Sequence, residues 1–130
     1  MHPDLIHLHT LEALDRLLAD SHARPLLLFK HSYTCGISAE ALDELVDHLN
    51  ADVLAAGMPE PQYAMVTVQT DREISNAVSR KLGVRHETPQ ALLVRDGRVI
   101  WSASHFRVTA DALKKALNGQ PEHGRGGGPR

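Results

Sequence analysis

The sequence contains a single cysteine, Cys35, among its 130 residues. One cysteine excludes an internal disulfide and is typical of a reducing compartment, where a thiol is either a buried apolar group or a reactive one. The chain also lacks any apolar run of the ~20 residues that cross a bilayer, and its start has no basic segment followed by an apolar one. We therefore expect a cytoplasmic protein with no membrane partner, whose chemistry depends on the position of Cys35.

Neither sign of charge is in large excess, since 14 Lys and Arg are scattered among 16 acidic residues. Without a stripe of positive charge, nucleic acid is not an expected partner. Hydrophobic residues make up 42% of the sequence, enough for a chain of this length to bury a core without disulfides or a metal. We expect one domain over residues 1–119, followed by a disordered Gly- and Pro-rich tail over residues 120–130.

Apolar patterns in the first half predict alternating strands and helices. Residues 5–9 alternate like a short strand, and Thr10 is placed to cap a helix that carries a leucine face. Residues 26–29 form a continuous apolar run, which is typical of a central strand covered on both faces. A polar turn, Cys35 and a helical pattern over residues 37–49 follow. Cys35 is thus predicted at a strand-to-helix junction.

Turn and capping signals divide the second half. A strand is predicted over residues 63–68, followed by a helix that begins with a capping box at Thr70-Asp71-Arg72-Glu73 and ends at Gly83. Two strands, over residues 91–95 and 98–103, are joined by a turn at Asp96-Gly97, and Thr109 caps a last helix. The predicted order is β-α-β-α-β-α-β-β-α. This order indicates the α/β class, with a mixed central sheet flanked by helices on both faces, and thioredoxin-like folds share it.

Cys35 has the surroundings of a reactive thiol. The thiolate is the attacking species in thiol–disulfide exchange, and the N–H groups and dipole of a helix N-terminus favour it. Lys30 and His31, just upstream, are expected to add positive charge. The alternative is an inert thiol buried at the start of a helix.

Ser38 stands three residues after Cys35, where a dithiol oxidoreductase carries its second cysteine. A serine can donate a hydrogen bond but cannot resolve a mixed disulfide. The sequence therefore predicts a monothiol mechanism, in which Cys35 takes a small thiol from a client protein and is later recycled by another thiol.

Thr88-Pro89 lies just before the predicted hairpin, where a cis proline would expose the preceding backbone to a substrate. Arg85 is close by in sequence and is either a ligand for a substrate carboxylate or a solvated loop charge. Nine histidines invite a metal hypothesis, yet His31 and Cys35 lack two further ligands at a recognised spacing. We expect no metal and no other cofactor.

Four separated motifs occur in order along the chain: Phe29-Lys30-His31-Ser32, Cys35-Gly36-Ile37-Ser38, Val84-Arg85-His86-Glu87-Thr88-Pro89-Gln90 and Trp101-Ser102-Ala103-Ser104-His105. Together they resemble the monothiol bacilliredoxin family, the YtxJ-like proteins of the bacillithiol system, over about residues 5–117. The resemblance implies a thioredoxin fold, a thiol–disulfide oxidoreductase that removes bacillithiol from S-thiolated proteins, Cys35 as the nucleophile and Pro89 as a cis proline. The chain departs from the family at Gly36, where a proline is usual.

From these observations we expect catalysis by Cys35 and substrate binding by Lys30, His31, Gly36, Ser38, Arg85, Thr88 and Pro89. The expected partners are S-thiolated client proteins, a low-molecular-weight thiol and a recycling reductant. Two alternatives stay open. Cys35-Gly36-Ile37-Ser38 also resembles the C-G-F-S signature of monothiol glutaredoxins, which hold an iron–sulfur cluster, although the T-V-P and double-glycine motifs of that family are absent. The other alternative is a non-catalytic thioredoxin-fold adaptor.

Overall fold

The computed structural model describes residues 2–51 and 54–119, and its elements alternate as the sequence predicts. They are β1 (Leu5–His7), α1 (Leu11–Asp20), β2 (Leu26–His31), α2 (Gly36–Asn50), β3 (Gln62–Thr67), α3 (Arg72–Leu82), β4 (Gln90–Arg95), β5 (Arg98–Ser104), a 3₁₀ turn η1 (His105–Arg107) and α4 (Ala110–Leu117). The five strands form one sheet in the order β1-β3-β2-β4-β5. β1, β3 and β2 run parallel, while β4 is antiparallel to both β2 and β5. This mixed sheet confirms the predicted fold class. The tail expected over residues 120–130 lies outside the described residues.

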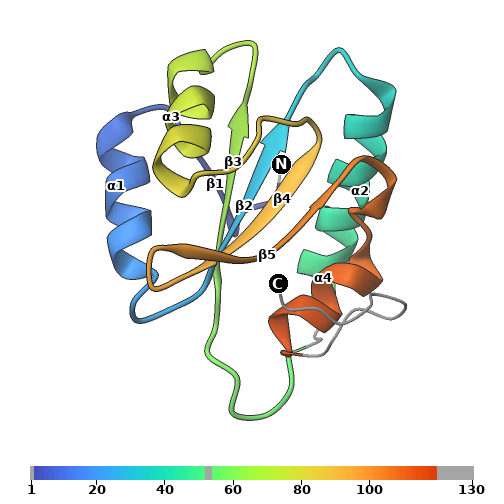
Figure 1. Ribbon diagram of the computed structural model, residues 1–130. Helices are drawn as coiled ribbons and strands as arrows, with labels where there is room; N and C mark the ends of the chain where they lie inside the picture. Colours follow the sequence, from blue (N-terminus) through green and yellow to red (C-terminus); the bar gives the residue numbers. More distant parts are fainter. Residues whose placement is uncertain (1, 52–53, 120–130) are drawn as a thin grey trace.

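The sheet separates two layers of helices, α1 and α3 on one side and α2 and α4 on the other (Figure 1). Alternate residues of β2 supply the core on each side. Leu27 and Phe29 pack in the cluster that also holds residues of α2 and α4. Leu26 and Leu28 pack in the cluster that also holds residues of α1 and α3. The apolar run expected to be covered on both faces is therefore a central strand.

Helix ends follow the predicted chemistry at three positions. Thr10 and Thr109 cap α1 and α4, each accepting a hydrogen bond from a backbone N–H three residues on. Gly83 ends α3 in the left-handed conformation with φ of 66°. The capping box predicted from Thr70 is wrong: the Thr70 hydroxyl donates to the Asp71 carboxylate, and Asp71 is the residue that precedes the helix.

The hairpin of β4 and β5 turns at Asp96 and Gly97, both of which have positive φ, at 53° and 75°. Two successive residues with positive φ match the type I′ turn that this pair favours. After β5 the chain enters η1, a short turn that the sequence patterns did not predict. Among the described residues, no helix is long and apolar enough to cross a membrane.

Candidate active site

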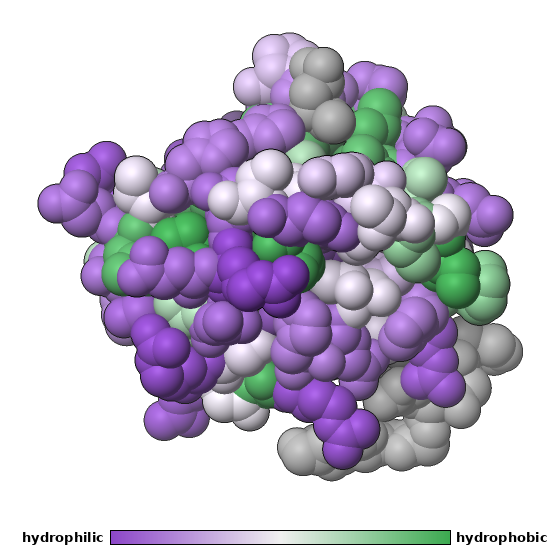
Figure 2. Space-filling model, turned by 90° about the horizontal axis from the view of Figure 1, so that it is seen from above, coloured by the Kyte–Doolittle hydropathy of each residue, from purple (hydrophilic) through white to green (hydrophobic). Residues whose placement is uncertain are grey.

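The strand register brings the Cys35 loop and Pro89 to the same end of the sheet. β2 ends at His31, and Lys30 pairs with Gln90, the first residue of antiparallel β4. The loop that follows β2 and the loop that precedes β4 therefore emerge at the same end of the sheet, the upper end in Figure 1. Seen from that end, the surface is mainly hydrophilic, with a few separate hydrophobic patches (Figure 2).

Cys35 is the residue that precedes the first turn of α2, and it is partly exposed. Its backbone carbonyl accepts from Ala39, the first bond of the helix, and no side chain among the described residues caps the helix. Backbone N–H groups in the first turn of a helix lack internal partners and carry the positive end of the dipole. The Cys35 thiol is therefore accessible at a point where these N–H groups stabilise negative charge.

Ser38 is fully buried and holds the start of α2 against the end of β2. The Ser32 N–H donates to Ser38 Oγ over 2.9 Å, and Ser38 Oγ lies 2.9 Å from His31 Nδ1. When the serine hydroxyl donates to Nδ1, the imidazole carries its proton on Nε2. Burial, with a smaller contribution from His7, lowers the pKa of His31, which favours this neutral ring. His31 and Ser38, two of the predicted binding residues, thus hold in place the loop over residues 32–35 that ends at Cys35.

Gln69, which follows β3, is a site residue that the sequence analysis missed. Its side-chain amide bonds to three consecutive residues of the loop before Cys35: Ser32, Tyr33 and Thr34. Gln69 is 35 to 37 residues from these partners in the chain. No local motif signals such a contact, which depends on the parallel pairing of β2 and β3.

Lys30 lies on the opposite side of the sheet from α2. Its ammonium group is buried, 2.7 Å from Ser79 Oγ on α3 and 3.0 Å from His86 Nδ1 in the loop that precedes Pro89. Burial lowers the pKa of Lys30 from its ordinary value of 10.5 to about 8. The structure therefore does not bring Lys30 to Cys35; it instead anchors the α3–β4 loop to the helix behind it.

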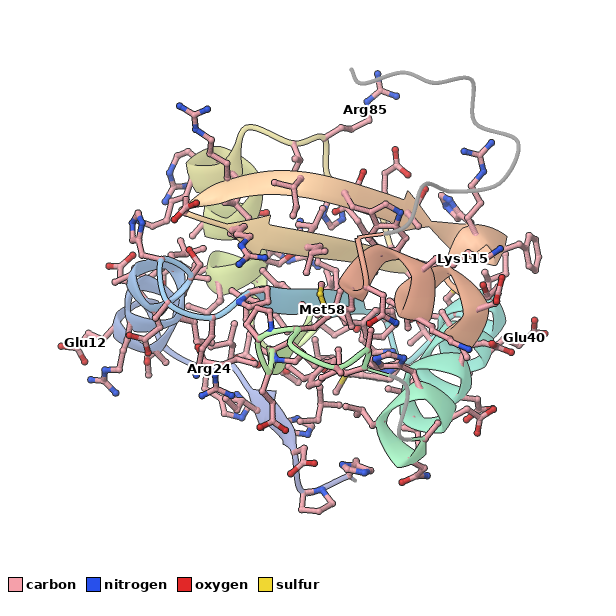
Figure 3. The ribbon with its side chains drawn as sticks, turned by 90° about the horizontal axis from the view of Figure 1, so that it is seen from below. Glu12, Arg24, Glu40, Met58, Arg85 and Lys115 are labelled. Carbon is pink, nitrogen blue, oxygen red and sulfur yellow. The ribbon has the colours of Figure 1, made fainter. Side chains whose placement is uncertain are left out.

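The Thr88–Pro89 peptide bond is cis, as predicted. The Pro89 carbonyl accepts from His105 N–H at 3.0 Å, so η1 is tied to the proline. Arg85 is exposed and points outward from the molecule (Figure 3). The geometry leaves Arg85 free to meet a ligand from solvent but does not direct it at Cys35.

A cavity of about 430 Å³ opens beside the proline loop. Its lining is mostly polar and comes from the loop, from β4 and β5, and from η1: Glu87, Gln90, Ser102, Ala103, Ser104, His105, Phe106 and Arg107. Gln90 is buried, and its Oε1 has no hydrogen-bond partner in the described part of the chain. No group of three or more potential metal-ligating side chains occurs among the described residues.

A single cysteine at a helix start and a cis-proline, both at the same end of a mixed sheet of this order, are the arrangement of a thioredoxin-fold thiol oxidoreductase. A comparison with family models narrows the class. Residues 6–113 match the model described as "Monothiol bacilliredoxin BrxC", so the chain belongs to the monothiol bacilliredoxin family. The match confirms the resemblance found in the four sequence motifs.

Solved structures agree with the fold. The chain is similar to a proposed oxidoreductase with a thioredoxin fold, at 26% identity and a TM-score of 0.71, covering 86% of this chain and 92% of the other. It is also similar to a mutant thioredoxin from Halobacterium salinarum, at 22% identity and a TM-score of 0.65, covering 94% and 96%. Fasciola hepatica thioredoxin matches at 19% identity and a TM-score of 0.64, covering 89% and 99%. The two thioredoxins support the fold alone.

Proposed function

We propose that this thiol oxidoreductase removes a low-molecular-weight thiol, bacillithiol, from S-thiolated client proteins in the cytoplasm through Cys35. The Cys35 thiolate attacks the bacillithiol sulfur of the client's mixed disulfide. The Cys35–bacillithiol disulfide forms as the client disulfide breaks, and the client sulfur leaves as a thiolate that takes a proton. Cys35 is oxidised and the client sulfur is reduced, so electrons balance without a cofactor.

The observation that carries this proposal is the placement of Cys35 at the start of α2 with a serine, Ser38, three residues on. A neighbouring thiol would attack the new mixed disulfide from within the chain. Ser38 has no such chemistry, and its hydroxyl is bonded to His31. The Cys35–bacillithiol product therefore waits for a second thiol, the recycling reductant, which attacks the bacillithiol sulfur and frees Cys35.

Pro89 and the cavity beside it support the substrate side of the proposal. Because β4 begins beside the end of β2, the residues before Pro89 lie at the same end of the sheet as the Cys35 loop, where a substrate would meet both. The polar cavity lining suits the non-thiol part of a small polar thiol. Arg85, exposed on the same loop, is a further candidate contact for a carboxylate on that thiol.

Intact-mass spectrometry tests the transfer directly. Reduced protein is mixed with a bacillithiolated client, and a parallel sample uses the same client carrying glutathione. We expect the mass of bacillithiol to move to the wild-type chain and the client thiol to be freed, with no transfer to Cys35→Ser. Preferential transfer from the bacillithiolated client supports the assignment of the small thiol. Equal transfer from both would remove bacillithiol selectivity, and no transfer from either would overturn the exchange mechanism.

A further inference from the structure

The side chain of Gln69 bonds to the loop between β2 and α2 from the end of the neighbouring strand β3. Gln69 Nε2 donates to Ser32 Oγ over 2.7 Å and to Thr34 Oγ1 over 3.1 Å, and its Oε1 accepts from the Tyr33 N–H at 3.3 Å. The Tyr33 N–H can only donate, so it determines which end of the amide faces it. The two hydroxyls then take the amide's two N–H groups.

Other hydrogen bonds join the loop to the first turn of α2 and to itself. The Ser32 N–H donates to Ser38 Oγ, and the Cys35 N–H donates to the Ser32 carbonyl at 3.3 Å. The hydroxyls of Ser32 and Thr34 lie 3.2 Å apart. Gln69 therefore completes a network that fixes three consecutive residues immediately before the thiol. Since Tyr33 and Thr34 are themselves exposed, core packing does not hold this segment in place.

We infer that Gln69 is a positioning residue for Cys35: by clamping residues 32–34, it keeps the sulfur at the N-terminus of α2. Loss of the clamp lets the loop take other conformations, in which the thiolate spends less time beside the helix N–H groups. The inference rests on the proposed exchange at Cys35 for its biological purpose. Its effect on thiol reactivity is independent of the substrate.

Two substitutions test separately the loss of the Gln69 hydrogen bonds and the effect of a negative charge at this position. Gln69→Leu keeps a side chain of similar size and removes all three hydrogen bonds. Gln69→Glu keeps the length and the acceptor for Tyr33, and the two hydroxyls can turn to donate to the carboxylate, but it adds a negative charge that opposes a nearby thiolate. Gln62→Leu is a matched control, because Gln62 is the first residue of β3, paired with Leu26 at the opposite end of the sheet from Gln69.

The test measures the rate of Cys35 alkylation by iodoacetamide against pH, with circular dichroism and urea unfolding on the same samples. We expect Gln69→Leu to slow alkylation at pH 7 by about three- to tenfold, the factor that corresponds to the net strength of one ordinary hydrogen bond. Gln69→Glu should move the midpoint of the rate–pH profile to higher pH. Gln62→Leu should change neither the rate nor the profile.

A folded Gln69→Leu protein with unchanged alkylation rate would overturn the inference and leave Gln69 as a purely structural residue. If Gln69→Leu does not fold, Gln69→Ala, which also removes the three hydrogen bonds, takes its place. Alkylation needs no bacillithiolated client. Slowed alkylation in the variants, with no thiol transfer by the wild type, would refute the proposed function and leave the positioning role intact.

Discussion

The variant Lys30→Met should be more stable than the wild type at neutral pH and less stable than the wild type at alkaline pH. The Lys30 ammonium is buried, and no carboxylate in the described part of the chain forms an ion pair with it. Burial of a charge without such a partner is unfavourable, which is the cause of the lowered pKa of about 8. Methionine fills a similar elongated volume without charge.

The size of the effect follows from the pKa. Lowering the pKa of Lys30 from 10.5 to about 8 corresponds to a destabilisation of about 3 kcal/mol, at about 1.4 kcal/mol for each pH unit. The full cost is present below pH 8. Between pH 8 and 10.5 the unfolded chain keeps a proton that the folded chain has released, so the stability of the wild type rises with pH across this interval.

The substitution also removes the bonds to Ser79 and His86, which contribute about 1 kcal/mol each. At pH 7 the expected balance is a variant about 1 kcal/mol more stable than the wild type. Near pH 10.5, where the charge no longer contributes, only the lost bonds remain, and the variant should be about 2 kcal/mol less stable. The difference in unfolding free energy therefore changes sign.

Urea unfolding followed by Trp101 fluorescence, from pH 7 to pH 10.5, measures this difference. Comparing the two proteins at each pH cancels the titration of groups they share. Lys114→Met, a substitution of an exposed lysine, is the control and should show a difference that does not vary with pH. A Lys30→Met difference that is equally constant would refute the argument, since it would mean that Lys30 has an ordinary pKa in the folded protein.

Substitutions at three further positions test the site and the helix ends. Ser38→Ala should cost about 1–3 kcal/mol in urea unfolding, because it leaves the buried Ser32 N–H and His31 Nδ1 without their partner; a neutral result would mean that water replaces the hydroxyl. Thr109→Ala should cost about 1 kcal/mol through the lost cap, and an unchanged melting temperature would contradict this. Gly36→Ala should fold, since a Cβ at Gly36 meets nothing within 4 Å, and Gly36→Pro should fold because Cys35 already has the extended backbone that a residue before proline adopts. Only proline removes an N–H of the first turn. Alkylation of Cys35 should therefore be slower in Gly36→Pro than in Gly36→Ala, and equal rates would exclude a role for that N–H.

Local patterns predicted most of the fold. The strands and α-helices were predicted from apolar periods, a continuous apolar run and turn signals, and the caps at Thr10, Thr109 and Gly83 follow from the chemistry of single residues. The failure at Thr70 has a local cause. The Asp71 carbonyl accepts from the Ser75 N–H, the first bond of the helix, so Asp71 rather than Thr70 precedes α3. Both residue types are common at this position, and the sequence alone did not show which of the two neighbours occupies it.

The site was predicted less completely, since its residues meet only through tertiary structure. Cys35 and Pro89 were found because each carries a local signal, a junction between elements and an X-Pro bond. Gln69 has no such signal, and its role depends on the pairing of β2 with β3. For Lys30, strand alternation predicts a side chain on the same face as Leu26 and Leu28, but alternation does not say which helices cover that face.

Side chains that alternate along β2 separate charged from neutral groups, just as they separate the two core clusters. Lys30 and His31 are adjacent, but the Lys30 ammonium contacts α3 on one side of the sheet, and the neutral His31 imidazole contacts α2 on the other. A slip of one residue in the pairing of β2 would exchange them and place a desolvated ammonium beneath the helix that bears Cys35. The charge near the thiol therefore depends on which residues of β2 face each side of the sheet. An insertion or deletion of one residue in β2 would change that charge more than most point substitutions would.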